Sequence, residues 1–198
     1  MLQLIETICY ENGHFQRIKL HEERLNRSRY NLFGNCNQLS LSPLLRIPAS
    51  LSEQKVRCRV TYSDVIENIE YEPYVCKNIR CLQLVWDDSI EYSYKYRNRE
   101  DLNKLLSLRD NADEILIVKN GLIADTSFTN IVFFKSGKWY TPEIPLLAGT
   151  RRADYLKKKL ILPAIIRPED LNQYDEAKLI NSMRSIKEDD AISISNIS

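Results

Sequence analysis

The strongest constraint on the fold is an Asn-Gly pair, Asn120-Gly121, between two short apolar segments. Residues 115–118 before the pair are all apolar and mostly β-branched, and Leu122-Ile123 follows it. Asn-Gly between such segments is the strongest short-range signal of a β-hairpin, because both residues accept the positive φ angles of a type I′ turn. Another apolar run, residues 131–134, comes soon after. Unbroken runs of this composition are typical of buried strands.

A carboxylate, Asp125, lies between these strand segments. It follows an apolar pair and precedes Thr126, Ser127, Phe128, Thr129 and Asn130. A buried acid without a partner is costly, so Asp125 is expected to be paired or hydrogen-bonded. A pyridinium nitrogen is one partner that would suit it. The alternative is an Asx-turn, in which Asp125 caps its own backbone at the far end of the hairpin.

Lys95 lies where a strand pattern gives way to a helical one. Residues 90–94 alternate apolar or aromatic with polar side chains, and leucines at i, i+3, i+4 spacing follow from Leu102. A lysine between Tyr94 and Tyr96 would be partly desolvated, which favours the neutral amine that attacks an aldehyde to form a Schiff base. The alternative is an ordinary solvated lysine, one of 28 Lys and Arg residues.

The pair Gly149-Thr150 reads as a glycine turn that opens an amphipathic helix through Tyr155, Leu156 and Leu160. The start of a helix presents free backbone N–H groups and the positive end of its dipole, which suits a phosphate. Ordinary helix capping would use the same residues.

These segments, in this order, resemble the class IV aminotransferase family, whose members include branched-chain and D-amino acid aminotransferases and 4-amino-4-deoxychorismate lyase. The resemblance extends to three other motifs. Residues 4–7, L-I-E-T, resemble the family's F-E-T segment, and residues 21–25, H-E-E-R-L, match its H-x-x-R-L element. Residues 179–186, L-I-N-S-M-R-S-I, resemble its late T-N-S-x-R-G-I segment. The resemblance covers about residues 4–186.

The resemblance implies that the cofactor is pyridoxal 5'-phosphate, bound to Lys95 as a Schiff base, and that Lys95 later moves the proton at the substrate α-carbon. Arg24 would bind the phosphate. Asp125 falls where the family usually has a glutamate facing the pyridine nitrogen, and a protonated ring nitrogen lets the ring accept electrons. The other cofactor-binding residues implied are Ser127 and Thr129 beside the ring, and Gly149, Thr150 and Ser182 at the phosphate.

Two departures from the family pattern follow from the sequence. Aspartate shortens the acid by one methylene, so Asp125 reaches the ring nitrogen only if its strand is shifted or the cofactor lies deeper. The chain also begins at the F-E-T-like segment, without the preceding stretch and its G-D-G-like turn. We therefore expect a short or a degenerate member of the family.

The expected fold class is α+β, since strands and helices follow one another without strict βαβ alternation. The resemblance implies a two-domain fold-type IV enzyme with the cofactor in the cleft between the domains. A small N-terminal α/β sandwich would span residues 1–75. A C-terminal mixed-sheet pseudo-barrel carrying the Schiff-base lysine would span residues 76–198, with Pro73 near the boundary. The family also implies a homodimer.

The resemblance implies an aminotransferase that acts on an amino acid and a 2-oxo acid through the Lys95 Schiff base. Two alternatives stay open. One is 4-amino-4-deoxychorismate lyase, which releases 4-aminobenzoate and pyruvate. The other is a protein that binds the cofactor without efficient turnover, as the shortened acid and the short N-terminus suggest.

The sequence also predicts elements outside these motifs. A hairpin is expected from residues 2–10 and 15–20, a helix over 22–33 that ends at Gly34, and a weaker helix interrupted by Pro43 and Pro48. The remaining expected elements are strands over 56–62, 66–71, 79–85, 138–140 and 177–183, and a helix over 99–108.

Composition excludes several classes of function. A net charge of +1 gives no reason to expect nucleic acid or a membrane surface as a partner. The five cysteines include no C-x-x-C pair, which disfavours disulfides and zinc and favours a reducing, cytoplasmic setting. With two histidines, His14 and His21, neither a metal site nor a Ser-His-Asp hydrolase is expected. No apolar run is long enough for a membrane span, and no signal peptide pattern is present.

Overall fold

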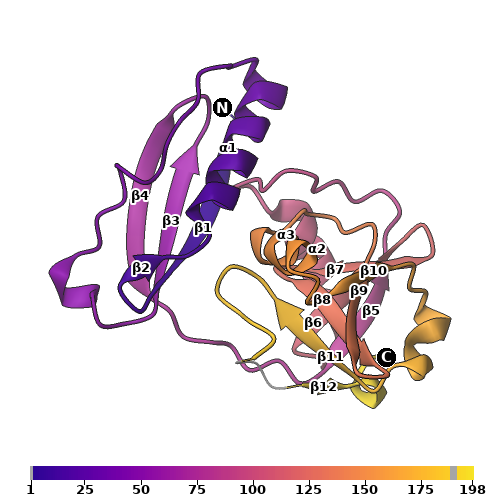
Figure 1. Cartoon of the computed structure of the whole chain (residues 1–198). Coiled ribbons are helices and arrows are strands. Elements are labelled where there is room, and N and C mark those ends of the chain that lie inside the picture. The colour runs from indigo at the N-terminus through magenta and orange to yellow at the C-terminus, as the bar shows by residue number, and fades with distance from the viewer. Residues whose placement is uncertain (1, 188–190) are drawn as a thin grey trace. The chain divides into compact units, whose positions relative to one another are not determined.

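The computed structural model describes residues 2–187 and 191–198. The chain divides into two compact units (Figure 1). Unit 1 comprises Met1–Cys76 and Tyr94–Asn98, and unit 2 comprises Lys77–Ser93 and Arg99–Ser198. The segment around Lys95, which we expected in the C-terminal domain, thus groups with the N-terminal unit.

Unit 1 is a four-stranded antiparallel sheet with a helix, α1, packed on it. The sheet order is β2-β1-β3-β4. The strands are β1 (Leu4–Glu11), β2 (His14–Phe15), β3 (Val56–Tyr62) and β4 (Ile66–Pro73). Period-two alternation places Leu4 and Ile8 of β1 on the face that packs with Leu25 of α1. The two strands expected over 56–62 and 66–71 are confirmed.

The helix α1 (Ile18–Phe33) begins earlier than expected. The predicted hairpin is confirmed, because β1 pairs with β2, but β2 ends at Phe15. The strand predicted to continue over residues 16–20 is wrong, since the helix begins at Ile18. Ile18, Leu25 and Leu32, spaced seven apart, lie along the face that packs on the sheet, so the helical period already includes Ile18. The helix ends as predicted at Gly34, whose φ of 67° is left-handed.

The helix expected around Pro43 and Pro48 is absent from the described chain. That stretch forms turns and a short 3-10 helix, Ala49–Leu51. Proline lacks the N–H that an α-helix needs and restricts the residue before it. Around Pro43 the chain therefore forms only a single turn, in which the Leu45 N–H donates to the Leu41 carbonyl at 3.1 Å.

Unit 2 contains two sheets. The three-stranded sheet has the order β5-β6-β7, and the five-stranded sheet has the order β10-β9-β8-β11-β12. The strands are β5 (Leu82–Trp86), β6 (Glu114–Lys119), β7 (Leu122–Thr126), β8 (Asn130–Lys135), β9 (Lys138–Pro142), β10 (Leu162–Ala164), β11 (Glu176–Ile180) and β12 (Ile192–Ser193). Two further 3-10 helices span Pro168–Gln173 and Ile194–Asn196.

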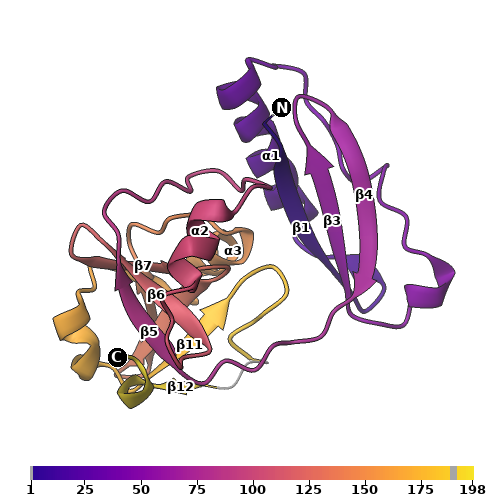
Figure 2. The same cartoon turned by 180° about the vertical axis from the view of Figure 1, so that it is seen from behind.

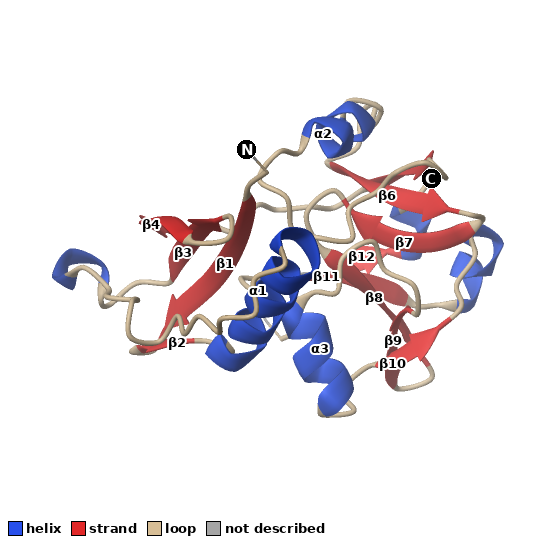
Figure 3. Ribbon diagram, turned by 90° about the horizontal axis from the view of Figure 1, so that it is seen from above, coloured by secondary structure: helices blue, strands red, loops and turns tan. Residues whose placement is uncertain are grey.

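Strands β6 and β8 are buried on both faces because each sheet is covered on both sides. Leu116 and Ile131 belong to the core between the two sheets, whereas Ile115 packs with α2 (Glu100–Leu106) on the outer face of the three-stranded sheet (Figure 2). Val132 packs with α3 (Thr150–Lys157) on the outer face of the five-stranded sheet (Figure 3). This layering explains the unbroken apolar runs.

The Asn-Gly hairpin is confirmed. Asn120 and Gly121 have φ angles of 52° and 74° and join the antiparallel strands β6 and β7. The strand predicted over residues 90–94 is wrong: this stretch is irregular, and Leu4 forms an isolated bridge with Tyr96. Its alternation reflects packing of separate side chains, since Ile90 and Tyr94 belong to different core clusters.

Candidate functional site

Asp125, near the end of β7, is 3% exposed and accepts hydrogen bonds from Asn130 and from the backbone at Leu146 and Leu147. Asn130 Nδ2 donates to Asp125 Oδ1 at 2.8 Å, and the Leu147 backbone N–H donates to Oδ2 at 3.0 Å. Both partners are distant from the backbone next to Asp125, so the Asx-turn alternative is wrong. Burial raises the pKa of Asp125 to about 6, although these bonds and the charge of Arg152 act in the opposite direction.

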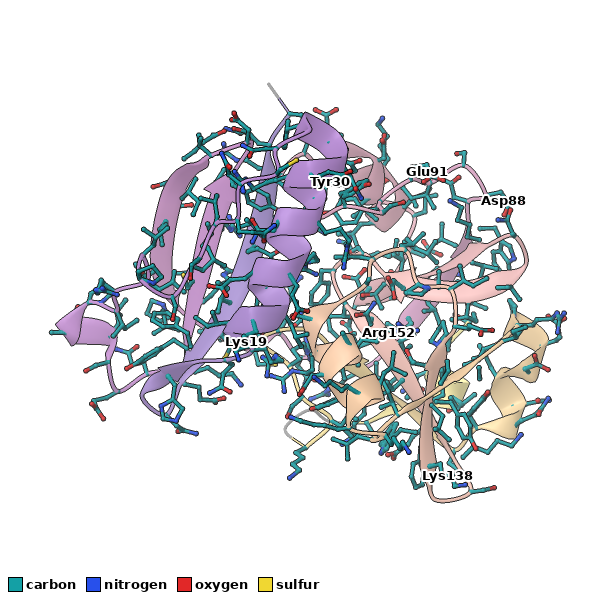
Figure 4. The ribbon with its side chains drawn as sticks, turned by 45° about the horizontal axis from the view of Figure 1, so that its top comes forward. Lys19, Tyr30, Asp88, Glu91, Lys138 and Arg152 are labelled. Atoms are coloured by element: carbon teal, nitrogen blue, oxygen red, sulfur yellow. The ribbon has the colours of Figure 1, made fainter. Side chains whose placement is uncertain are left out.

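No cation forms an ion pair with Asp125 within the described chain. Arg152, labelled in Figure 4, acts on it only through its charge. The Arg152 guanidinium instead donates to the Pro142 carbonyl at 2.7 Å and to Thr141 Oγ1 at 3.3 Å. A buried carboxylate without a close cation suits a protonated ring nitrogen, which would supply the missing charge.

A tight turn carries Ser127 and Thr129 directly after Asp125. Thr126 Oγ1 contacts Thr129 Oγ1 at 2.7 Å and accepts the Thr129 backbone N–H at 3.0 Å. Both backbone groups of Ser127 are also held, because its N–H donates to Glu114 Oε1 at 3.3 Å and its carbonyl accepts from Arg99 Nη2 at 2.7 Å. The turn is therefore fixed by side chains from β6 and from the residue before α2.

Gly149 and Thr150 begin α3, as predicted. Gly149 has an extended backbone, with φ −68° and ψ 142°, so its conformation does not require glycine. Space does: a Cβ on Gly149 would overlap Asn130 Oδ1 and would lie 3.1 Å from Asn130 Cγ. Asn130 therefore contacts both Asp125 and the residue before α3.

Arg151 ties the start of α3 to the segment after β11. Its Nε donates to the Asn181 carbonyl at 2.7 Å and its Nη2 to the Ser182 carbonyl at 3.0 Å. Asn181 shapes that turn by accepting the Met183 N–H at 2.8 Å. Ser182 thus lies in a turn that is bonded to the same helix start as Thr150.

Arg24 lies in unit 1, on α1, in a buried ion pair with Glu6 of β1. Its Nε and Nη2 donate to the two carboxylate oxygens of Glu6 at 2.8 and 2.6 Å, and His21 Nδ1 lies 2.6 Å from Oε2. Burial opposes the ionisation of Glu6, but Arg24 and His21 outweigh it and lower the pKa to about 2. Burial lowers the pKa of His21.

Lys95 also belongs to unit 1 and is partly buried. Its carbonyl accepts the Ile5 N–H at 2.9 Å, which anchors the segment to β1. The flanking Tyr94 and Tyr96 rings lie 6.0 Å apart, edge to face. Of the predicted residues, Arg24 and Lys95 are therefore in unit 1. The other six lie in unit 2: Asp125, Ser127, Thr129, Gly149, Thr150 and Ser182.

Sequence reasoning missed the residues that hold this site in place: Arg99, Glu114, Thr126, Asn130, Arg151 and Arg152. One signal was available. Two consecutive arginines in the first turn of a helix oppose the helix dipole, so Arg151 and Arg152 needed acceptors elsewhere. No helix of the described chain is long and apolar enough to cross a membrane.

Comparison with known proteins gives consistent matches. A family model described as amino-transferase class IV matches residues 3–188. An uncharacterized protein of Haemophilus influenzae is 40% identical over 188 residues, 94% of this chain and all of that protein. The crystal structure of a Haemophilus somnus protein, provisionally named a 4-amino-4-deoxychorismate lyase, is 34% identical with a TM-score of 0.89, covering 94% of this chain and 98% of that one.

Two more distant structures share the fold. A Mesorhizobium loti protein, provisionally named an amino-acid aminotransferase, is 22% identical with a TM-score of 0.79 and 98% coverage of both chains. A hypothetical aminotransferase from Mycobacterium tuberculosis, in its form bound to pyridoxal phosphate, is 16% identical with a TM-score of 0.76. This match covers 98% of our chain and 81% of the other. The expected α+β, fold-type IV architecture is thereby confirmed.

Proposed function

Because the chain belongs to the class IV aminotransferase family, we propose that it is a pyridoxal-phosphate-dependent enzyme whose cofactor is attached to Lys95. The family consists of pyridoxal phosphate enzymes that act on small amino-acid substrates. The observation that carries the proposal is Asp125, a buried carboxylate with no ion-pair partner in the described chain. Its environment supports a contact with a protonated ring nitrogen.

In this proposal the predicted residues hold the cofactor, and Lys95 also moves a proton. When bound, the cofactor supplies an electron sink for the carbanion left by proton loss. Lys95 takes the proton from the carbon that bears the substrate's amino group. Asp125 would keep the ring nitrogen protonated. Gly149, Thr150, Ser182 and Arg24 would bind the phosphate, and Ser127 and Thr129 would lie beside the ring.

Elimination of pyruvate from 4-amino-4-deoxychorismate, with release of 4-aminobenzoate, is the reaction we rank first. The sequence alone favoured transamination. The relative that is 34% identical and covers nearly the whole chain carries a provisional lyase name, whereas the two aminotransferase-named structures described above are at most 22% identical and support only the fold. Transamination is the second candidate, because the family model that matches residues 3–188 is described as an aminotransferase.

The test of the cofactor assignment is an absorbance titration with pyridoxal phosphate, followed by borohydride. The wild type should gain a visible band that borohydride bleaches, with a permanent covalent link to Lys95 found by peptide mass spectrometry. Lys95→Ala should show neither. The matched control is Lys104→Ala, an exposed lysine paired with Asp101 on α2, which should behave as the wild type. Equal bands in all three proteins would refute the role of Lys95.

The two reactions are then separated by product analysis. Wild-type protein is incubated with 4-amino-4-deoxychorismate and, separately, with amino acids plus 2-oxoglutarate. Pyruvate and 4-aminobenzoate from the first mixture support elimination, and glutamate from the second supports transamination. The remaining outcome is a protein that binds the cofactor, gives no product from either mixture and exchanges no amino acid α-proton in heavy water. That result would support the third alternative, a protein that binds the cofactor without turnover. We also propose a homodimer, which light scattering of the purified protein tests.

A further inference from the structure

We infer that Asn130 is a positioning residue that holds the Asp125 carboxylate and the start of α3 in one fixed arrangement. The inference rests on the proposed function, in which Asp125 meets the ring nitrogen and the start of α3 meets the phosphate. One amide side chain would thereby set both ends of the cofactor site within unit 2.

The contacts form a closed set of three hydrogen bonds. Asn130 Nδ2 donates to Asp125 Oδ1 at 2.8 Å and to the Leu147 carbonyl at 2.9 Å. The Leu147 N–H donates to Asp125 Oδ2 at 3.0 Å. An amide nitrogen has two hydrogens, so it serves both acceptors at once. The acid cannot move without breaking a bond to Asn130, to Leu147 or to both.

The other end of the same amide contacts Gly149. A Cβ on Gly149 would overlap Asn130 Oδ1, so the backbone before α3 lies directly against the amide oxygen. Asn130 is 5% exposed. It is the first residue of β8, where it pairs with Ile180 of β11. The amide is therefore anchored in a sheet and reaches the acid on one side and the helix start on the other.

The short acid makes this positioning consequential. Aspartate has one methylene fewer than glutamate and cannot compensate for a shift of its strand by changing its side-chain conformation. Loss of a hydrogen bond to a charged group costs enough to weaken binding by roughly 10- to 100-fold where that group contacts the ligand. A displaced Asp125 should therefore weaken cofactor binding even though Asn130 itself does not touch the ring.

The test compares Asn130→Leu with Asn26→Leu. Asn26 is the matched control because it is also a buried asparagine, bonded to both backbone groups of Leu39 at 2.9 Å in unit 1. Leucine has the branched shape of asparagine and is somewhat larger, so each variant removes a buried amide without opening a cavity. A purely structural role predicts similar losses of stability in both and no other difference.

The first measurements use the protein without cofactor, so they are independent of the proposed function. Carboxyl NMR titration should show the pKa of Asp125 higher in Asn130→Leu, since a bond that stabilises the ionised form is gone, and unchanged in Asn26→Leu. The Leu147 amide should exchange with solvent at least tenfold faster in Asn130→Leu only. If neither quantity changes in a folded Asn130→Leu protein, the inference is overturned.

The second measurements ask whether both ends of the site respond. Dissociation constants are determined for pyridoxal, inorganic phosphate and pyridoxal phosphate. Asn130→Leu should weaken pyridoxal and phosphate separately, and pyridoxal phosphate by roughly 10- to 100-fold. A loss confined to pyridoxal or confined to phosphate would refute the claim that one residue sets both ends. If the wild type binds none of the three ligands, the proposed function fails, and the cofactor-free measurements still decide whether Asn130 holds Asp125.

Discussion

The buried carboxylate of Asp125 should make the cofactor-free protein less stable at neutral pH, and Asp125→Asn should relieve that cost. Burial raises the pKa of Asp125 from 3.8 to about 6 in the folded chain. The folded state therefore holds a proton that the unfolded state releases between these two values. The ionised acid destabilises the fold above pH 6, and this cost disappears as the pH falls towards 3.8.

The magnitude follows from the two pKa values. Their difference, at 1.36 kcal/mol for each unit, corresponds to about 3 kcal/mol at pH 8. Asparagine offers one oxygen in place of two, so either Asn130 Nδ2 or the Leu147 N–H loses its acceptor, at about 1 to 2 kcal/mol. We therefore expect Asp125→Asn to raise the free energy of unfolding by about 1 to 2 kcal/mol at pH 8. At pH 4 it should lower it by about 1 kcal/mol.

Tryptophan fluorescence during urea unfolding is a suitable assay, because both tryptophans of the chain, Trp86 and Trp139, belong to unit 2 together with Asp125. The signal therefore follows the unit that contains the substitution. Asp101→Asn, at an exposed position on α2, is the control and should show no such pH dependence. A difference between wild type and Asp125→Asn that is the same at pH 4 and pH 8 would refute the reasoning.

Substitutions at Gly149, Asn130, Glu6 and Arg151 test the contacts of the predicted residues. Gly149→Ala should lower the free energy of unfolding by about 2 kcal/mol or more, because the new Cβ displaces the Asn130 amide from its two acceptors. In a double-mutant cycle, the protein that carries both Gly149→Ala and Asn130→Ala should lose much less stability than the sum of the two single losses. Glu6→Gln should cost about 3 kcal/mol at pH 7 by leaving a buried guanidinium uncompensated. The fold lowers the pKa of Glu6 from 4.5 to about 2, so the ionised Glu6 stabilises the folded state above pH 4.5, and this stabilisation is lost as the pH falls towards 2. Amide exchange in β1 should therefore become faster over this pH range in the wild type and not in Glu6→Gln. Arg151→Met should increase amide exchange in the turn at Ser182 and weaken binding of inorganic phosphate, whereas Lys158→Met, at an exposed position after α3, should change neither.

The sequence predicts correctly those turns and helix ends that depend on a few adjacent residues. The Asn-Gly turn, the end of α1 at Gly34 and the start of α3 at Thr150 each depend on a few adjacent residues, and all three are found. One of the failures has a cause that is distant in the sequence. Residues 90–94 alternate as a strand does, but a strand needs a neighbour to pair with, and the sequence does not show where a neighbour lies.

The site shows the same division between local and distant causes. Asp125 stands out because it interrupts an apolar run, so sequence reasoning could identify it. Its partner Leu147 could not be identified in that way, since it is 22 residues away. The contact of Arg99 with Ser127 spans 28 residues and could not be identified either. Such pairs are formed by the packing of two sheets and are not encoded by spacing.

The hydrogen bonds around Asp125 join residues of a single unit, and this affects how the site binds a ligand. Asp125, its turn and the start of α3 are held by hydrogen bonds that lie entirely within unit 2. Their arrangement is thus set before any ligand arrives, and pre-organised groups lose little entropy on binding. In such a fixed site an aspartate can replace the glutamate that is usual in the family, because the carboxylate is already held in position and does not have to extend further towards the ligand. We therefore expect Asp125→Glu to bind pyridoxal phosphate more weakly than the wild type, since the longer side chain cannot keep both bonds at 2.8 and 3.0 Å without displacing Asn130 or Leu147. Tighter binding by Asp125→Glu would mean that reach, and not position, limits this site.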